Sequence, residues 1–304
     1  MIKTTTINNV ATLLMELDNI KVRCDFVKEE KLLYRGQGNT QYELIPSIGR
    51  RPNGSIYNSL TFHESDIYEE ARKAFPIEFS DDLSPIDFLI KLQHYGIPTR
   101  LLDVSESPLI ALFFACDDGI SKDNEGELIV FKNTHYRPTY DAISEAIADT
   151  ANIDCGDLNE FLEVALSKSY FNNEREIVKK KLGTSKDKER NWIIECCSKP
   201  IYIHRAFLTN RQQNQLGGFL LFSNKIVTNE NTGIMTFSNE MKPIDKNDEE
   251  MILHRFIIPK DKKNEILEQL NMLGINKRTL FSDSIDIVCK EIKKHYESRY
   301  KIDF

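Results

Sequence analysis

The sequence contains no long apolar run. None of its hydrophobic stretches approaches the roughly 18–20 residues that cross a membrane as a helix. The opening segment lacks the apolar core and the small-residue cleavage site of a signal peptide. We therefore expect a cytoplasmic protein with no membrane association.

Metal-binding and disulfide patterns are also missing. The six histidines are dispersed, and no cysteine forms a CxxC pair or lies near a histidine at ligand spacing. Scattered cysteines in a chain of 304 residues predict reduced, mostly buried thiols and a cytosolic setting. We expect no metal site. The six cysteines are Cys24, Cys116, Cys155, Cys196, Cys197 and Cys289.

Familiar catalytic signatures are absent as well. The sequence has no GxGxxG, no GxxxxGK[ST], no HExxH, no GxSxG and no EF-hand loop. The net charge of −7 argues against a surface built mainly to bind nucleic-acid phosphates. With 40% hydrophobic and 29% charged residues, the composition is that of an ordinary globular protein.

What is present is a mixture of strand and helix patterns without regular alternation. Strand patterns occur before and after a long block, at about residues 138–198, in which only helical spacing is found. This order predicts a single α+β domain with a mixed, mainly antiparallel sheet, flanking helices and a helical insertion. A separate small helical domain is the alternative, but no Pro/Gly/Ser linker borders the block. The expected strands are Lys31–Gly36, Thr99–Asp103, Glu127–Lys132, Lys199–Ala206, Gly217–Phe222, Thr232–Ser238 and Met251–Ile258.

The most informative stretch is Leu92–Cys116. Gly96 suits a position of positive φ at the end of a helix, and Pro98 prevents the helix from continuing. Ser107 and Pro108 then form the expected N-cap and first residue of a helix that is apolar on nearly every side. Such a helix is predicted to be central in the fold.

Three polar residues far apart in the sequence are placed at the edges of apolar structure. Arg35 ends a strand before a glycine, Asp103 ends another strand, and Gln215 precedes two glycines and a strand. We predict that they converge on one cleft, where Arg35 grips a phosphate or carboxylate. The alternative is a structural Arg35 that pairs with Asp103 or Glu43.

Arg100, three residues before Asp103 in the sequence, also has two interpretations. It is either a ligand contact or half of a buried ion pair that sets the register of the strand. His94 and Tyr95 could stack on a ring or occupy ordinary boundary positions, and Ser105 could be a simple turn residue.

Four motifs in this order resemble the FRG domain family, which is named for a Phe-Arg-Gly motif. The first is YRGQ, with LIPSIGR shortly after it, and Tyr34 stands where the family name has Phe. The longest is LQHYGIPTRLLDVSESPLIALFFA. RQQNQLGGF and LGINKRTLFSDSIDIV complete the resemblance, which covers most of the chain from about Lys31, apart from the helical block.

The same layout is similar to that of ADP-ribosyltransferases. The resemblance implies an ADP-ribosyltransferase-like fold in which Arg35 holds NAD and Gln215 occupies the region of a late catalytic Glu. Arg211–Phe219 contains no Glu, so Glu43, Glu106 or Asp103 would have to substitute. The implied catalytic residues are Arg35, Asp103 and Gln215. The implied contacts to the dinucleotide are Tyr34, Gly36, Gln37, His94, Tyr95, Thr99, Arg100, Ser105 and Arg211.

Two classes of function follow. The first is an NAD-consuming or ADP-ribosylating effector, in a toxin system or in phage defence, that acts on a protein or nucleic-acid target. The second is a non-catalytic module that senses a nucleotide or a phage component. The first is favoured because three polar clusters at the edges of apolar structure are typical of a cleft lining.

Overall fold

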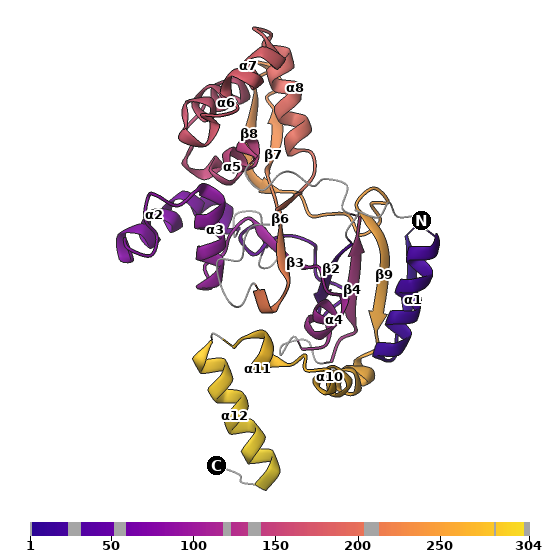
Figure 1. The fold of residues 1–304 in the computed structure, drawn as a ribbon. Helices are drawn as coiled ribbons and strands as arrows, with labels where there is room; N and C mark the ends of the chain where they lie inside the picture. The colour runs from indigo at the N-terminus through magenta and orange to yellow at the C-terminus, as the bar shows by residue number, and fades with distance from the viewer. Residues whose placement is uncertain are drawn as a thin grey trace.

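The computed structural model describes residues 2–23, 32–51, 59–117, 123–132, 141–203, 213–282 and 284–300. The fold is α+β, as predicted, with one large mixed sheet and a separate two-stranded ribbon. The large sheet has seven strands in the order β1-β9-β4-β2-β3-β6-β5 (Figure 1). Only β1 and β9 pair in parallel, so the sheet is mainly antiparallel. Its strands are β1 (Lys3–Thr6), β2 (Leu33–Gln37), β3 (Leu101–Ser105), β4 (Gly126–Phe131), β5 (Ile201–Ile203), β6 (Gly217–Leu221) and β9 (Ile252–Ile258).

Two strands were not predicted from the sequence. β1 pairs with β9 across the whole length of the chain, and β7 (Asn224–Thr228) pairs with β8 (Met235–Met241) in the ribbon. Most residues of β1 and β7 are partly or fully exposed and show no apolar alternation. They therefore lack the pattern by which strands are recognised.

One face of the sheet is covered by α1 (Val10–Arg23), α4 (Pro108–Cys116) and α10 (Lys263–Met272), whose apolar side chains share a core with β2, β4 and β9. The N-cap prediction for α4 is confirmed, because Ser107 accepts a hydrogen bond from the Ile110 amide. The predicted positive φ of Gly96 is also found, at 85°.

A second core joins six further helices to the end of the sheet at β5 and β6. The helices α5 to α8 and the β7–β8 ribbon form one end of the molecule (Figure 1). Between residues 141 and 198 the described chain holds only helices, and whether this block is an insertion in one domain stays an interpretation. The helices of this side are α2 (Glu64–Ala74), α3 (Pro85–His94), α5 (Ala142–Ala148), α6 (Leu158–Ser167), α7 (Arg175–Leu182) and α8 (Lys186–Cys197).

The last described segment consists of α11 (Lys277–Leu280) and α12 (Ile285–Tyr300), and α12 projects from the body of the molecule (Figure 1). Among the described helices, none has both the length and the apolar composition needed to cross a bilayer.

Candidate functional site

The large sheet opens between β2 and β3. All five residues of β2 pair with β4, and all five of β3 pair with β6. β2 and β3 are joined at only one register pair, Tyr34 with Ser105. A cavity of about 690 Å³ lies at this opening and is lined by Arg35, Asp103 and Gln215. The predicted convergence of these three residues on one cleft is therefore confirmed.

Gly36 positions the strand that carries Arg35. A Cβ at Gly36 would lie 1.7 Å from the Ala111 carbonyl oxygen of α4, so no side chain fits there. Gly126 of β4 meets the Ala115 carbonyl in the same way, with a Cβ distance of 2.3 Å. Helix α4 thus lies directly against two strands, and this contact fixes the end of β2 beside the cavity.

Arg35 has only part of its hydrogen-bonding capacity satisfied. Its Nη1 donates to the Asp103 carbonyl oxygen at 2.6 Å, while its Nε is buried and has no partner among the described residues. Burial lowers the pKa of the guanidinium; Asp103 raises it and the charge of Arg50 lowers it further. A buried donor without an acceptor costs free energy, so this group is suited to receive an anion.

The opposite wall comes from the loop after β2. Tyr42, Glu43 and Arg50 line the cavity and are exposed. The Arg50 side chain forms no hydrogen bond or ion pair within the part of the chain that the structure describes, whereas Arg51 pairs with Glu240 at 3.2 Å. Two guanidinium groups with unused donors, Arg35 and Arg50, therefore border one cavity.

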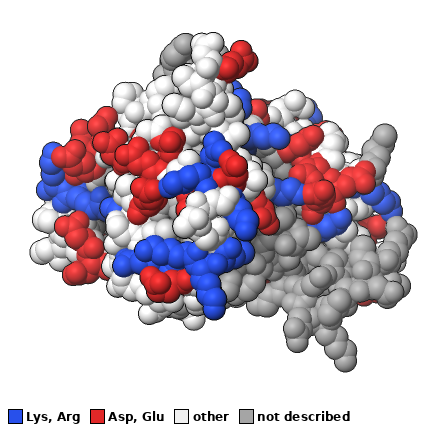
Figure 2. Space-filling model, turned by 90° about the horizontal axis from the view of Figure 1, so that it is seen from above, with Lys and Arg blue, Asp and Glu red and all other residues white. Residues whose placement is uncertain are grey.

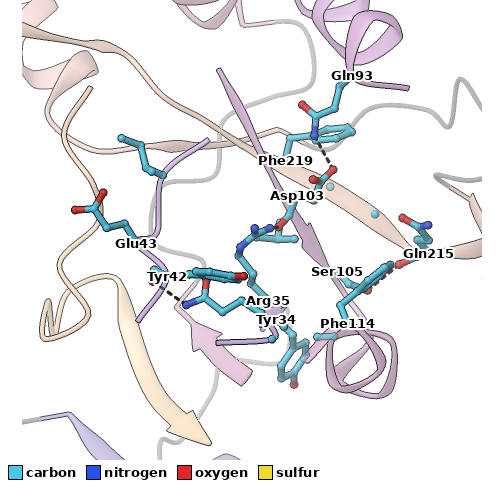
Figure 3. Close-up of a pocket in the computed structure, with 18 of the residues that line it drawn as sticks. Tyr34, Arg35, Tyr42, Glu43, Gln93, Asp103, Ser105, Phe114, Gln215 and Phe219 are labelled. Atoms are coloured by element: carbon cyan, nitrogen blue, oxygen red, sulfur yellow. Dashed lines mark hydrogen bonds between the residues drawn. The ribbon is translucent and has the colours of Figure 1, made fainter. Parts of the chain in front are cut away.

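A relay of three side chains holds the carboxylate on the other side. The buried Thr99 hydroxyl donates to Gln93 Oε1 at 2.5 Å. Gln93 Nε2 in turn donates to Asp103 Oδ1 at 2.7 Å (Figure 3). Because the hydroxyl occupies the amide oxygen, the amide nitrogen must face Asp103. Thr99 is thus a positioning residue and does not itself line the cavity.

Gln37 lines the cavity, but its amide is engaged. Its Nε2 donates to the Tyr42 carbonyl and to Glu127 Oε2, each at 3.0 Å. The fully buried Glu127 also accepts from Lys246 at 2.5 Å and from Arg255 at 2.6 Å. This charge cluster ties the loop after β2 to β4 and β9, so the amide nitrogen of Gln37 has a structural role. A ligand contact by Gln37 stays a prediction.

Gln215 is also engaged. Its Nε2 donates to the Leu280 carbonyl at 3.2 Å, and its backbone carbonyl accepts from the Ser105 hydroxyl at 2.8 Å. Ser105 and Gln215 line the cavity, as does Tyr34, whose pKa burial raises to about 12. The amide of Gln215 is therefore directed to α11, although it was expected to act on the ligand.

Arg100 and Tyr95 correct the sequence-based assignment. Arg100 is fully buried, donates from Nε to Glu64 Oε1 at 2.9 Å and from Nη1 to the Ile147 carbonyl at 3.1 Å, and does not line the cavity. Its second contact to Glu64 completes the ion pair. Tyr95 is 57% exposed and likewise lies outside the cavity lining, while its neighbour His94 lines it. Arg211 lies outside the described residues.

Sequence reasoning did not select several residues that line the cavity, among them Tyr42, Arg50, Gln93 and Phe114. Their only signal was position. Arg50, Gln93 and Phe114 lie inside the motifs of the FRG resemblance, and Tyr42 lies between two of these motifs. No group of three or more His, Cys, Asp or Glu that could hold a metal ion occurs among the residues with described positions.

Comparison with known proteins identifies part of the chain. The family model of the FRG domain matches residues 30–124, which include β2, α2, α3, β3 and α4. The resemblance to the FRG domain family is therefore confirmed over this segment. No curated protein and no solved structure matches the chain. The similarity to ADP-ribosyltransferases thus rests on the sequence motifs alone.

Proposed function

We propose that the FRG domain of this chain binds a dinucleotide through its pyrophosphate, in the cavity between β2 and β3. NAD is the expected ligand. The observation that carries this proposal is the buried Nε of Arg35, which has no partner among the described residues. A pyrophosphate supplies anionic oxygens to two guanidinium groups, and Arg35 and Arg50 border the same cavity.

The remaining lining matches the other parts of a dinucleotide. Asp103 offers a carboxylate to ribose hydroxyls, with its orientation fixed by Gln93. Tyr42 and Phe114 offer aromatic rings on which a base can stack. A volume of about 690 Å³ falls within the range of small-molecule sites, which is roughly 300–1,000 Å³.

The charge on the surface bears on whether the macromolecular target is a protein or a nucleic acid. Figure 2 shows basic and acidic side chains interspersed over most of the face that it displays, with one group of adjoining basic side chains low in its centre. The net charge of −7 favours a protein target over a nucleic acid.

Cleavage of NAD is the second candidate, and Asp103 is the observation that favours it. Its carboxylate is exposed to the cavity and could stabilise positive charge on the ribose while the C1′–N bond breaks. Nicotinamide would leave with the bonding electrons, and water or an acceptor would form the new bond to C1′ and lose a proton. Consumption of NAD in this way is the chemistry proposed for a toxin or phage-defence effector.

Calorimetry with NAD and with ADP-ribose tests binding. We expect Arg35→Lys and Arg50→Gln each to weaken binding at least tenfold, which is about 1.4 kcal/mol. Arg190→Gln is the matched control, because Arg190 pairs with Asp187 on the surface of α8. Absence of binding by the unchanged protein, or equal losses in the control, would contradict the proposal.

Nicotinamide release separates enzyme from sensor. If the chain cleaves NAD, Asp103→Asn should abolish release while NAD still binds. If NAD binds and no nicotinamide appears, the function is that of a nucleotide-binding module. Release that continues unchanged in Asp103→Asn would rule out the catalytic role of Asp103.

A further inference from the structure

The edge between β2 and β3 divides the large sheet into two parts. The first part is β1, β9, β4 and β2, and the second is β3, β6 and β5. The two parts share the single register pair Tyr34 with Ser105, and the cavity lies at this edge. One pair fixes the spacing of two strands less firmly than the five-residue ladders on either side. The width of the cavity therefore depends on contacts outside the sheet as well.

Residues 277–282, which we call the α11 segment, contact the first part of the sheet through α4. The Phe281 ring packs edge-on against Phe114 with a centroid distance of 6.1 Å. Lys277 Nζ lies 2.9 Å from Asp117 Oδ2. Phe114 and Asp117 both line the cavity, and α4 packs directly on β2.

The α11 segment contacts the second part through the residues that precede β6. Gln215 Nε2 donates to the Leu280 carbonyl at 3.2 Å, and Asn214 Nδ2 donates to Ser282 Oγ at 2.7 Å. The backbone carbonyl of Gln215 accepts from the Ser105 hydroxyl of β3 at 2.8 Å. Figure 1 shows α11 at the end of the sheet where β6 begins. The α11 segment therefore joins the two parts of the sheet through residues of both parts that line the cavity.

We infer that docking of the α11 segment sets the width of the cavity, and that docking and binding of the dinucleotide favour each other. This inference rests on the proposed function, which supplies the ligand. Helix α11 has four residues, too few for a stable helix alone in water, so its contacts and the buried Leu280 side chain hold it. A ligand that fits the docked width favours docking by the same factor by which docking favours the ligand.

Calorimetry with NAD tests the effect of docking on the ligand. Lys277→Ala with Phe281→Ala removes the two contacts to α4 and leaves every residue that lines the cavity in place. We expect the NAD affinity of this double variant to fall at least fivefold, whereas Lys277→Arg keeps the ion pair and the affinity. Lys262→Ala is the matched control, because Lys262 pairs with Glu265 at the surface. Unchanged NAD affinity in the double variant would overturn the inference and leave the proposed function intact.

Hydrogen exchange tests docking without any ligand. In the double variant, the amide groups of β2 and β3 should exchange several-fold faster than in the wild type, while those of β9 keep their rates. No acceleration, or equal acceleration in β9, would mean that the α11 segment does not hold the edge of the cavity. Failure of the wild type to bind NAD contradicts the proposed function instead, and the exchange rates then still decide whether the α11 segment sets the width.

The reciprocal effect is measured in the wild type. The amides of Leu280 and Phe281 donate to the carbonyls of Asn276 and Lys277 when α11 is formed. Saturating NAD should slow the exchange of these two amides at least fivefold, because the coupling acts equally in both directions. Bound NAD with no change in these rates is the result that refutes the coupling.

Discussion

Two arginines near neighbouring strands of the same sheet have opposite surroundings. Arg100 precedes β3, is fully buried, and donates to Glu64 and to the Ile147 carbonyl. Arg35 lies in β2, donates to the Asp103 carbonyl from Nη1, and has a buried Nε with no partner among the described residues. Burial opposes the charge of Arg100, yet Glu64 more than offsets this and the pKa is raised, whereas the pKa of Arg35 is lowered by burial.

The difference separates a structural arginine from a binding arginine. The protein itself supplies the anion for Arg100, so the guanidinium joins α2, β3 and α5 and has no role left for a ligand. Arg35 lines a cavity, and its buried Nε has no partner among the described residues. A free donor next to a cavity, and not the mere presence of arginine, is what points to a ligand.

The largest expected effect is the loss of the Arg100 pair. Glu64→Gln leaves a buried guanidinium without its counter-charge and should lower the free energy of unfolding by about 3–5 kcal/mol. Urea denaturation measures this. Glu265→Gln is the control, because Glu265 pairs with Lys262 at the surface, and it should cost less than about 0.5 kcal/mol. Equal costs for the two variants would break the comparison.

Gly36→Ala should have the next largest effect. The new Cβ would lie 1.7 Å from the Ala111 carbonyl, so α4 must move away from β2. We expect a loss of roughly 2–3 kcal/mol, as for other overpacked sites. Gly156→Ala at an exposed position is the control. If Gly36→Ala is as mild as the control, the helix does not position the strand that carries Arg35.

The local elements of this region could be predicted because their signals are local. Ser107, Pro108 and Gly96 act through their own backbone geometry, and the structure confirms them. The convergence of Arg35 and Asp103 was also predicted, because strand ends concentrate polar groups at sheet edges.

The partners of these side chains could not be predicted. Glu64 is 36 residues from Arg100, and nothing in the sequence around Arg100 indicates which carboxylate will reach it. Gln93 is oriented by Thr99 only because a turn brings the two together. Similarly, β1 consists of exposed polar residues and becomes a strand through pairing with β9.

Tyr34, next to Arg35 in the chain, sharpens the comparison through pH. Burial raises the pKa of Tyr34 to about 12 from the ordinary 10. The unfolded chain therefore loses the Tyr34 proton first, and the stability due to this group is present below pH 10 and is lost as pH rises through about 12. At pH 11 the wild type should have lost about 1.4 kcal/mol more than Tyr34→Phe. Urea denaturation from pH 8 to 11 measures the difference, and parallel curves for the two proteins would contradict it.

Arg35→Met gives the smallest expected change in stability and the most direct test of the difference between the arginines. The substitution removes one hydrogen bond to the Asp103 carbonyl, but it also removes a buried donor that has no partner among the described residues. These contributions oppose each other, so the free energy of unfolding should change by less than about 1 kcal/mol.

Arg100→Met leaves Glu64 buried without its counter-charge and should destabilise by about 3–5 kcal/mol. Calorimetry should show the opposite order of effects on NAD affinity. Arg35→Met should lose NAD binding, whereas the folded fraction of Arg100→Met should still bind NAD. A large stability loss for Arg35→Met with NAD affinity unchanged would make Arg35 a second structural arginine, and Arg50 would then have to bind the anion without it.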